Sequence, residues 1–234
     1  MPNAPTETRS ASPRLWPACA ITAVLFVFAC KAVAEAPLET TMGMVQKIFY
    51  FHVPCAWLLM LSALVCAGGS LAYLFSGSER GDRVALSASE LGVAFGLCVL
   101  VSGPLWAKAA WGVYWQWEAR LTSSLLLFLM MVAYVLARRY GGASARRLAA
   151  ALALFAAVDI PLIYFSVRFF RSIHPQTTVV STLGPGMKGA FWISLIAFTA
   201  LWWVLFSTRL ATENAQARLI DLEILLDQAE ERKA

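Results

Sequence analysis

Six long apolar runs divide this chain and limit what it can fold into. They cover approximately residues 15–34, 54–76, 84–106, 121–137, 148–166 and 188–207. Each run is close to the roughly 20 residues that a helix needs to cross a bilayer. Only 14% of the residues are charged, whereas a soluble domain carries about 25%. The sequence therefore predicts an all-α integral membrane protein, built as a six-transmembrane-helix bundle.

The basic residues indicate how these helices are oriented. They cluster in alternate loops, which must lie on one side of the membrane, and the positive-inside rule makes that side the cytoplasm. Both termini are then cytoplasmic, and the loops 35–53, 107–120 and 167–187 face outward. Membrane topology explains the excess of basic residues. This excess therefore does not indicate a nucleic-acid partner. The clustered residues are Arg9, Arg14, Arg80, Arg83, Arg138, Arg139, Arg146, Arg147 and Arg209.

The chain divides into two parts of different character. Residues 1–208 form the six-span membrane domain, and Ala32-Val33-Ala34 resembles a signal-peptide cleavage site, although we expect an uncleaved first helix because the apolar run is long. Residues 209–234 are polar and are expected to form a cytoplasmic C-terminal helix. Leu219, Leu222 and Leu226 fall at heptad spacing, but the repeat is too short to predict a coiled coil. We expect this helix to lie against its own protein.

Two kinds of residue inside the apolar runs carry chemistry of their own. Five cysteines form no CxxC pair, which argues against a thiol-redox motif, a disulfide framework or a structural zinc site. They are expected to be small buried apolar residues. The acids Glu90 and Asp159 also fall inside predicted spans. Such acids are candidates for function because a charge is costly there, but Glu90 lies near the cytoplasmic end and can reach water.

The chain contains only two histidines, His52 and His174. The predicted topology places both on the outer side, His52 where a loop enters the second span and His174 after the fifth. Each precedes a proline, Pro54 or Pro175, which favours extended backbone just before it. Each also has aromatic neighbours in the sequence. The two side chains are therefore candidates for one shared site.

A tryptophan-rich stretch, WGVYWQWEAR at residues 111–120, lies on the same predicted side. An extended chain would place Trp111, Val113, Trp115 and Trp117 on one side. A helix would instead place Trp111, Tyr114, Trp115 and Glu118 on one face. Either geometry makes an aromatic shelf, and an interfacial aromatic belt is the plainer alternative.

These features together favour haem as the ligand. A flat apolar ring fits an aromatic shelf, and two imidazoles fit the two axial positions of haem iron. Zinc would need a third ligand such as Glu118, and it would give no reason for the tryptophans. The anionic propionates of haem would pair with cations, and the candidates are Lys108, Arg120, Arg168 and Arg171.

Two functions of other classes remain alternatives. A multi-pass solute permease would use the outer loops as a gate, but permeases often show internal repeats, and none is evident here. A membrane acid–base enzyme acting on a lipid-linked substrate would use His52, His174 and Glu118. That enzyme would leave the tryptophans unexplained.

Three segments of the sequence resemble those of a known family. The segments IFYFHVPCAW, SGPLWAKAAWGVYWQWEARLT and IYFSVRFFRSIHPQTT are similar to those of the tryptophan-rich "WWD" haem-handling membrane proteins of cytochrome c maturation. The length and span count match the C-type branch (CcmC, haem exporter protein C). One difference is Glu118, where the signature usually has aspartate. A second is Phe169-Phe170, where the family often has paired tryptophans.

The resemblance implies a function and a set of partners. Family members bind haem b (iron protoporphyrin IX) at the periplasmic face of the bacterial cytoplasmic membrane and deliver it to a periplasmic haem chaperone (CcmE-like). They associate with ABC-type transporter subunits (CcmA/CcmB-like) and with a small single-span protein (CcmD-like), and they transfer haem without hydrolytic activity of their own. The match implies axial ligation by His52 and His174. It implies haem contacts from Trp111, Tyr114, Trp115, Trp117, Glu118 and Arg120.

Overall fold

A computed structural model of the 234-residue chain describes residues 15–142, 144–174 and 179–232. Within these ranges it contains no strand, only an isolated bridge between Glu39 and Gly43. Six helices are long and apolar enough to cross a membrane, and each contains one predicted span, which confirms the all-α six-helix membrane fold. They are α1 (Leu15–Glu35), α2 (Phe49–Ser76), α3 (Glu79–Trp111), α4 (Ala119–Tyr140), α5 (Ala145–Phe169) and α7 (Met187–Glu231). Two short helices, η2 (Met44–Ile48) and α6 (Val179–Thr182), lie in the connections.

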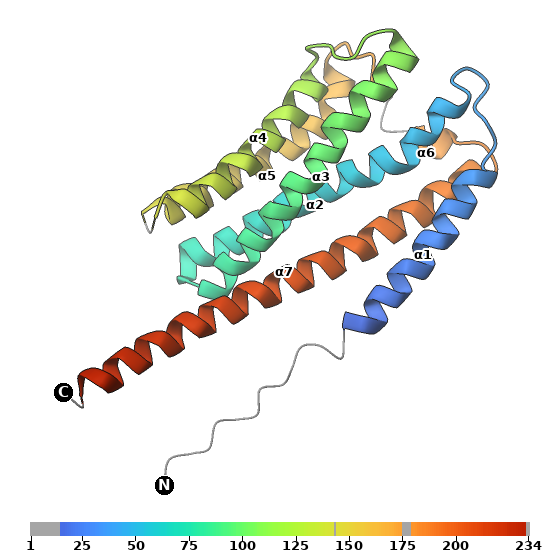
Figure 1. Cartoon of the computed structure of the whole chain (residues 1–234). Helices are drawn as coiled ribbons and strands as arrows, with labels where there is room; N and C mark the ends of the chain where they lie inside the picture. The colour runs from blue at the N-terminus through green and yellow to red at the C-terminus, as the bar shows by residue number, and fades with distance from the viewer. Residues whose placement is uncertain (1–14, 143, 175–178, 233–234) are drawn as a thin grey trace.

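The helices pack as a group of four with a pair beside it. Figure 1 shows α2, α3, α4 and α5 together, while α7 runs along α2 and α3, and α1 runs along α7. Helices α2 and α3 approach each other closely, since a β-carbon added at Gly69 would stand 2.5 Å from the carbonyl oxygen of Gly81. Small residues allow this approach because no side chain separates the two backbones. The tight α2–α3 turn uses Gly77 at φ +65°, a conformation that glycine adopts at little cost.

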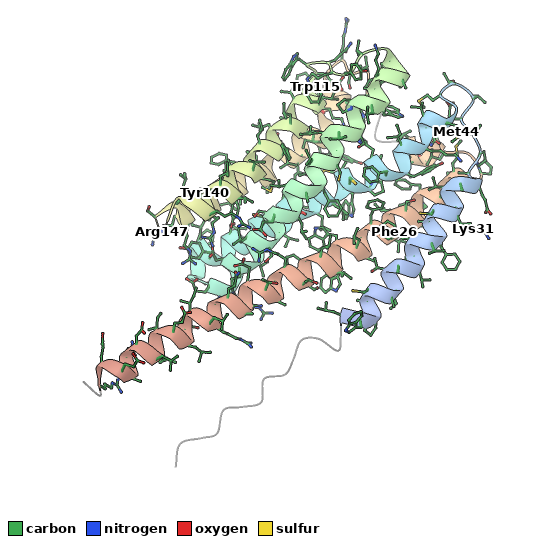
Figure 2. All side chains as sticks on the ribbon, viewed as in Figure 1. Phe26, Lys31, Met44, Trp115, Tyr140 and Arg147 are labelled. Carbon is green, nitrogen blue, oxygen red and sulfur yellow. The ribbon has the colours of Figure 1, made fainter. Side chains whose placement is uncertain are left out.

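Ion pairs join the helices at the end where the α2–α3 and α4–α5 turns lie. Asp82 of α3 accepts hydrogen bonds from Arg138 of α4 at 2.5 Å and from Arg146 of α5 at 2.7 Å. Glu90 of α3 pairs with Arg139 and Arg209. The arginines that indicated topology in the sequence therefore also hold helix ends together. Tyr140 and Arg147 mark this end in Figure 2.

The other three connections gather at the opposite end, as expected for alternate loops (Figure 1). Trp115 lies there in Figure 2. In the α1–α2 connection, the Glu39 carboxylate accepts hydrogen bonds from the backbone N–H groups of Met42 (2.6 Å) and Thr41 (2.8 Å). The bond from Met42 is the main reason that the pKa of Glu39 lies below its usual value. The carboxylate of Glu39 therefore stabilises this turn through local hydrogen bonds.

The backbone around His52 differs from the sequence prediction. Pro54 was expected to keep the preceding residues extended, but η2 leads directly into α2, and both His52 and Pro54 lie within that helix. Pro54 is the sixth residue of α2, so it removes the hydrogen bond that the carbonyl of Tyr50 would otherwise accept. Membrane-spanning helices tolerate such prolines because neighbouring groups satisfy the freed carbonyl. His52 is thus held by helical backbone rather than by a loop. Pro175 lies outside the described residues.

The prediction that the C-terminal helix lies against its own protein is wrong. Helix α7 continues without a break from the sixth span to Glu231 and extends beyond the other helices (Figure 1). From Arg218 to Arg232 every described side chain is exposed. The heptad leucines Leu219, Leu222 and Leu226 are therefore exposed.

The cysteines follow their predicted environment only in part. Cys55 and Cys66 are fully buried in the core of the bundle, as small apolar residues would be. Cys19 and Cys30 instead lie exposed on α1, a helix that packs along α7 and leaves most of its surface uncovered.

Candidate functional site

A cavity of about 330 Å³ opens among the helices near the end that carries the tryptophan-rich connection. Its volume is within the range of ligand pockets, about 300–1,000 Å³, and such pockets are mostly apolar with a few polar groups. Side chains from α2, α3, α4, α5 and α7 line it, together with residues of the connections. Six of the predicted site residues are among them, namely His52, Trp111, Tyr114, Trp115, Arg120 and His174.

His52 is held on α2 by contacts with α3. Its Nδ1 atom lies 2.9 Å from the hydroxyl oxygen of Ser102, and that hydroxyl lies 2.6 Å from the carbonyl oxygen of Cys98. Gly103 leaves room for the imidazole, because a β-carbon there would stand 3.1 Å from Cε1 of His52. The ring is half-buried and lines the cavity. The imidazole therefore has a fixed neighbour on one nitrogen and open space on the cavity side.

His174 reaches the same cavity from the segment that follows α5. Its imidazole lies with its centroid 6.1 Å from the ring of Trp111, in an edge-to-face arrangement. Its backbone N–H donates to the hydroxyl of Ser172 at 3.0 Å. The two histidines are far apart in the sequence, but both line the same cavity in the fold.

The tryptophan-rich stretch is neither of the two shapes considered from the sequence. Helix α3 continues to Trp111, Gly112 ends it at φ +78°, and residues 112–118 form an irregular connection. Trp111, Tyr114 and Trp115 line the cavity. Trp117 does not line it: its ring packs 5.7 Å from that of Trp115, and 77% of the side chain is exposed.

Glu118 also lies outside the cavity lining, and its carboxylate has a different contact. Its Oε2 atom accepts a hydrogen bond from the backbone N–H of Ile173 at 2.9 Å. Ile173 immediately precedes His174. Glu118 therefore ties the tryptophan-rich connection to the segment that carries the second histidine.

The other predicted cations differ from Arg120 in position. Lys108 does not line the cavity, since its ammonium donates to the carbonyl of Gly112 at 2.9 Å and lies 5.3 Å from the Tyr114 ring centroid. Arg168 lies over the ring of Phe165, with 5.7 Å between its guanidinium carbon and the ring centroid, and Arg171 is exposed. Arg120 is the predicted cation that reaches the cavity.

Three buried donor atoms on the cavity lining lack an acceptor among the described residues. They are Nε1 of Trp106, Nε1 of Trp115 and Nη1 of Arg120. Buried polar atoms in proteins are nearly always hydrogen-bonded, so these donors are available to a ligand that carries acceptor oxygens. An anion is favoured, because a guanidinium binds carboxylates strongly.

Sequence reasoning missed Trp106, Ser102 and Gly103 as parts of the site. Trp106, which lies outside the tryptophan-rich stretch, lines the cavity and packs with its ring centroid 4.9 Å from that of Trp111. A tryptophan five residues before the aromatic stretch, on the same helix, was the available signal. Ser102 and Gly103 carry no sequence signal, because their importance depends on the pairing of α2 with α3.

The acids inside the spans have separate surroundings. Glu90 belongs to the ion pairs at the far end. Asp159 is buried on α5 and is hydrogen-bonded to Ser123, while its Oδ2 atom has no partner among the described residues. It lies one helical turn from Ile163, which lines the cavity. Neither acid forms part of the cavity lining.

This arrangement fits the flat, iron-bearing ligand expected from the sequence. Within the described residues no group of three or more histidine, cysteine, aspartate or glutamate side chains could hold a bare metal ion. Two imidazoles on one cavity can complete the coordination of an iron that brings its own ring of ligands. Aromatic walls match the faces of such a ring, and the three unpaired donors match its carboxylates.

Comparisons with known proteins identify the family of the chain. The family described as heme exporter protein C matches residues 2–227. The heme exporter protein C of Bradyrhizobium diazoefficiens is 34% identical over 94% of this chain and 87% of its own length. That of Escherichia coli K12 is 30% identical over 80% of this chain and 77% of its own length. A Marchantia polymorpha protein named as ccmC-like, mitochondrial and of cytochrome c biosynthesis is 31% identical over 77% of each chain. The chain therefore belongs to the heme exporter protein C (CcmC) family.

Proposed function

We propose that this protein takes part in haem export for cytochrome c maturation, by holding haem b in the cavity and passing it to another protein. One observation carries the proposal: the only two histidines of the chain, His52 and His174, line the same cavity. The names of the relatives, heme exporter protein C, support the same function. The chain acts as a transfer component, and no hydrolytic step is assigned to it.

Each group of side chains has its own part in binding. Imidazole nitrogens of His52 and His174 ligate the iron, which supplies the affinity for the metal centre. Trp111, Tyr114 and Trp115 bury the faces of the porphyrin, since aromatic rings combine a large apolar area with few rotatable bonds. Arg120, with the indole N–H groups of Trp106 and Trp115, meets the propionates. Glu118 positions the segment that carries His174. Trp117 packs against the ring of Trp115.

The orientation and the partners follow from the topology and the family. The arginine-rich turns lie at the end opposite the cavity. Under the positive-inside rule, this arrangement supports a cavity that faces the periplasm and termini that lie in the cytoplasm. The location is the bacterial cytoplasmic membrane. The receiving protein is a periplasmic haem chaperone, and an ABC-type transporter and a small single-span protein are the membrane partners. The exposed tryptophan-rich connection and Trp117 provide a surface that such a chaperone can reach.

The proposal is tested by visible spectroscopy of the purified full chain. The unmodified protein, produced in a host that makes haem, is expected to show the sharp, split reduced bands of six-coordinate haem. His52→Ala and His174→Ala should each lose or alter those bands. Trp203→Ala is the matched control, because Trp203 is exposed on α7 and does not line the cavity. A protein that stays colourless after haem is added would refute the proposal.

A second variant separates haem binding from acid–base catalysis. Trp115→Ala removes an aromatic wall and an indole donor while leaving both histidines and Glu118 in place. Haem affinity should fall at least tenfold, since an aromatic side chain buries a large apolar area. Unchanged haem affinity would favour the acid–base alternative.

A further inference from the structure

The contact between His52 and Ser102 has a direction that the chemistry of the two side chains decides. A serine hydroxyl has one proton to donate and two lone pairs that accept. The Ser102 hydroxyl lies 2.6 Å from the carbonyl oxygen of Cys98, one helical turn earlier, and a carbonyl can only accept. The single proton of Ser102 is therefore directed to Cys98. At 2.9 Å from the same oxygen, Nδ1 of His52 must be the donor.

We propose that Ser102 is a positioning residue that keeps the His52 proton on Nδ1 and so reserves Nε2 as the iron-binding atom. A neutral imidazole carries one N–H and one lone pair, and the hydrogen bond of one nitrogen selects which form is present. With Nδ1 protonated, the lone pair stands on Nε2. Within the described part of the chain, the structure assigns Nε2 no hydrogen-bond partner. The assignment of Nε2 as a ligand of haem iron rests on the proposed function.

The surroundings of Ser102 make it suited to this part. The residue is 7% exposed and lies on α3 opposite the first turns of α2. Its neighbour Gly103 leaves the space that the imidazole occupies. The Ser102 hydroxyl is bonded on both sides, so rotating it away from His52 would break a hydrogen bond of a buried side chain. The ring therefore has one preferred orientation before any ligand arrives.

The choice of a hydroxyl has a consequence for haem release. Histidine ligands in permanent metal sites often donate to a carboxylate, which raises the basicity of the ligand. Ser102 is an uncharged acceptor, so it orients the ring without that increase in donor strength. A ligand that is well oriented but not strengthened suits a protein that passes haem on.

The first experiment reads the tautomer of His52 directly, without haem. The His174→Ala variant leaves His52 as the only histidine of the chain, so labelling with ¹⁵N-histidine reports one ring by NMR. At a pH where the ring is neutral, we expect Nδ1 to show a protonated nitrogen signal and Nε2 an unprotonated one. Adding Ser102→Ala should shift the signals toward the opposite tautomer, and Ser102→Thr should restore the original pattern. A proton on Nε2 in the chain with Ser102 intact would overturn the proposal.

The second experiment measures haem retention in the chain that keeps both histidines. Loss of an outer hydrogen-bond partner of a metal ligand typically costs 10–100-fold in affinity, so Ser102→Ala should accelerate haem loss by at least tenfold and Ser102→Thr should not. Ser194→Ala is the matched control, because Ser194 is buried, donates to the carbonyl of Ala190 at 2.7 Å and does not line the cavity. Equal haem loss from Ser102→Ala and Ser194→Ala would overturn the positioning role. If the unmodified chain bound no haem, the proposed function would fail, while the NMR result on Ser102 would stand.

Discussion

The carboxylate of Glu118 accepts a hydrogen bond from the backbone N–H of Ile173 at 2.9 Å. This bond joins the residue that precedes α4 to the residue that precedes His174. The tryptophan-rich connection and the second histidine segment are thus linked by an acid that does not itself line the cavity. The position usually holds aspartate in the family that the sequence resembles, and the longer glutamate side chain extends the reach of the carboxylate by one methylene.

Removing this link should loosen His174 while leaving His52 in place. A hydrogen bond to a charged group contributes about 1.5–3 kcal/mol, so Glu118→Ala should weaken haem binding about tenfold or more. Glu118→Gln retains a side-chain oxygen that accepts from Ile173 and should retain most of the affinity. Haem titration of the purified variants measures the difference. Equal affinities for the alanine and glutamine variants would contradict the proposed link.

Space beside His52 is expected to matter as much as its hydrogen bond. A β-carbon at Gly103 would stand 3.1 Å from Cε1 of His52, so Gly103→Ala should displace the imidazole and change the haem spectrum. Gly68→Ala is the matched control, because a β-carbon there meets nothing within 4 Å. In a helix interior that control should be neutral or stabilising by about 0.5–1 kcal/mol. Identical spectra for the two variants would show that His52 does not need the space that Gly103 leaves.

The sequence was enough to predict the helices but not all of the site. Apolar length predicts a membrane helix without knowledge of neighbours, which is why all six spans were found. His52, His174 and Arg120, which line the cavity, are polar residues beside apolar runs, and they stand out in the sequence for that reason. Ser102 and Gly103 lie fifty residues or so along the chain from His52, and only the packing of α2 on α3 brings them together.

Two errors have a common physical cause. Proline was expected to keep the residues before it extended, and the C-terminal leucines were expected to find a surface on the same chain. Both expectations used local rules, and in both places a continuous helix was the outcome. A membrane-spanning helix tolerates an internal proline such as Pro54 because neighbouring groups satisfy the freed carbonyl. A helix that continues straight out of the bundle leaves its apolar residues without a neighbour.

The ion pairs at the far end should affect stability and not haem. Asp82 and Arg138 keep 6% and 12% of their side chains exposed, and removing one partner of a buried pair costs about 3–5 kcal/mol. Because Arg146 still contacts Asp82 in the variant, Arg138→Met should destabilise the protein by about 3 kcal/mol, the lower end of that range. Thermal or denaturant unfolding measures the loss, with the exposed Arg147→Met as control. A haem spectrum altered by Arg138→Met but not by Arg147→Met would contradict the separation of the two ends.

Arg120 should select the propionates, and the ligand itself can be changed to test this. Its Nη1 atom is buried on the cavity lining without an acceptor among the described residues. Haem and its dimethyl ester share iron and ring but differ in the two negative charges. The unmodified chain should therefore bind haem more tightly than the ester, by about tenfold for each charged hydrogen bond of about 1.5 kcal/mol. Arg120→Ala should remove that preference by weakening haem and sparing the ester. Arg171→Ala removes an exposed arginine outside the cavity and should keep the preference. If Arg120→Ala weakened both ligands equally, the residue would support the fold of the site rather than recognise the propionates.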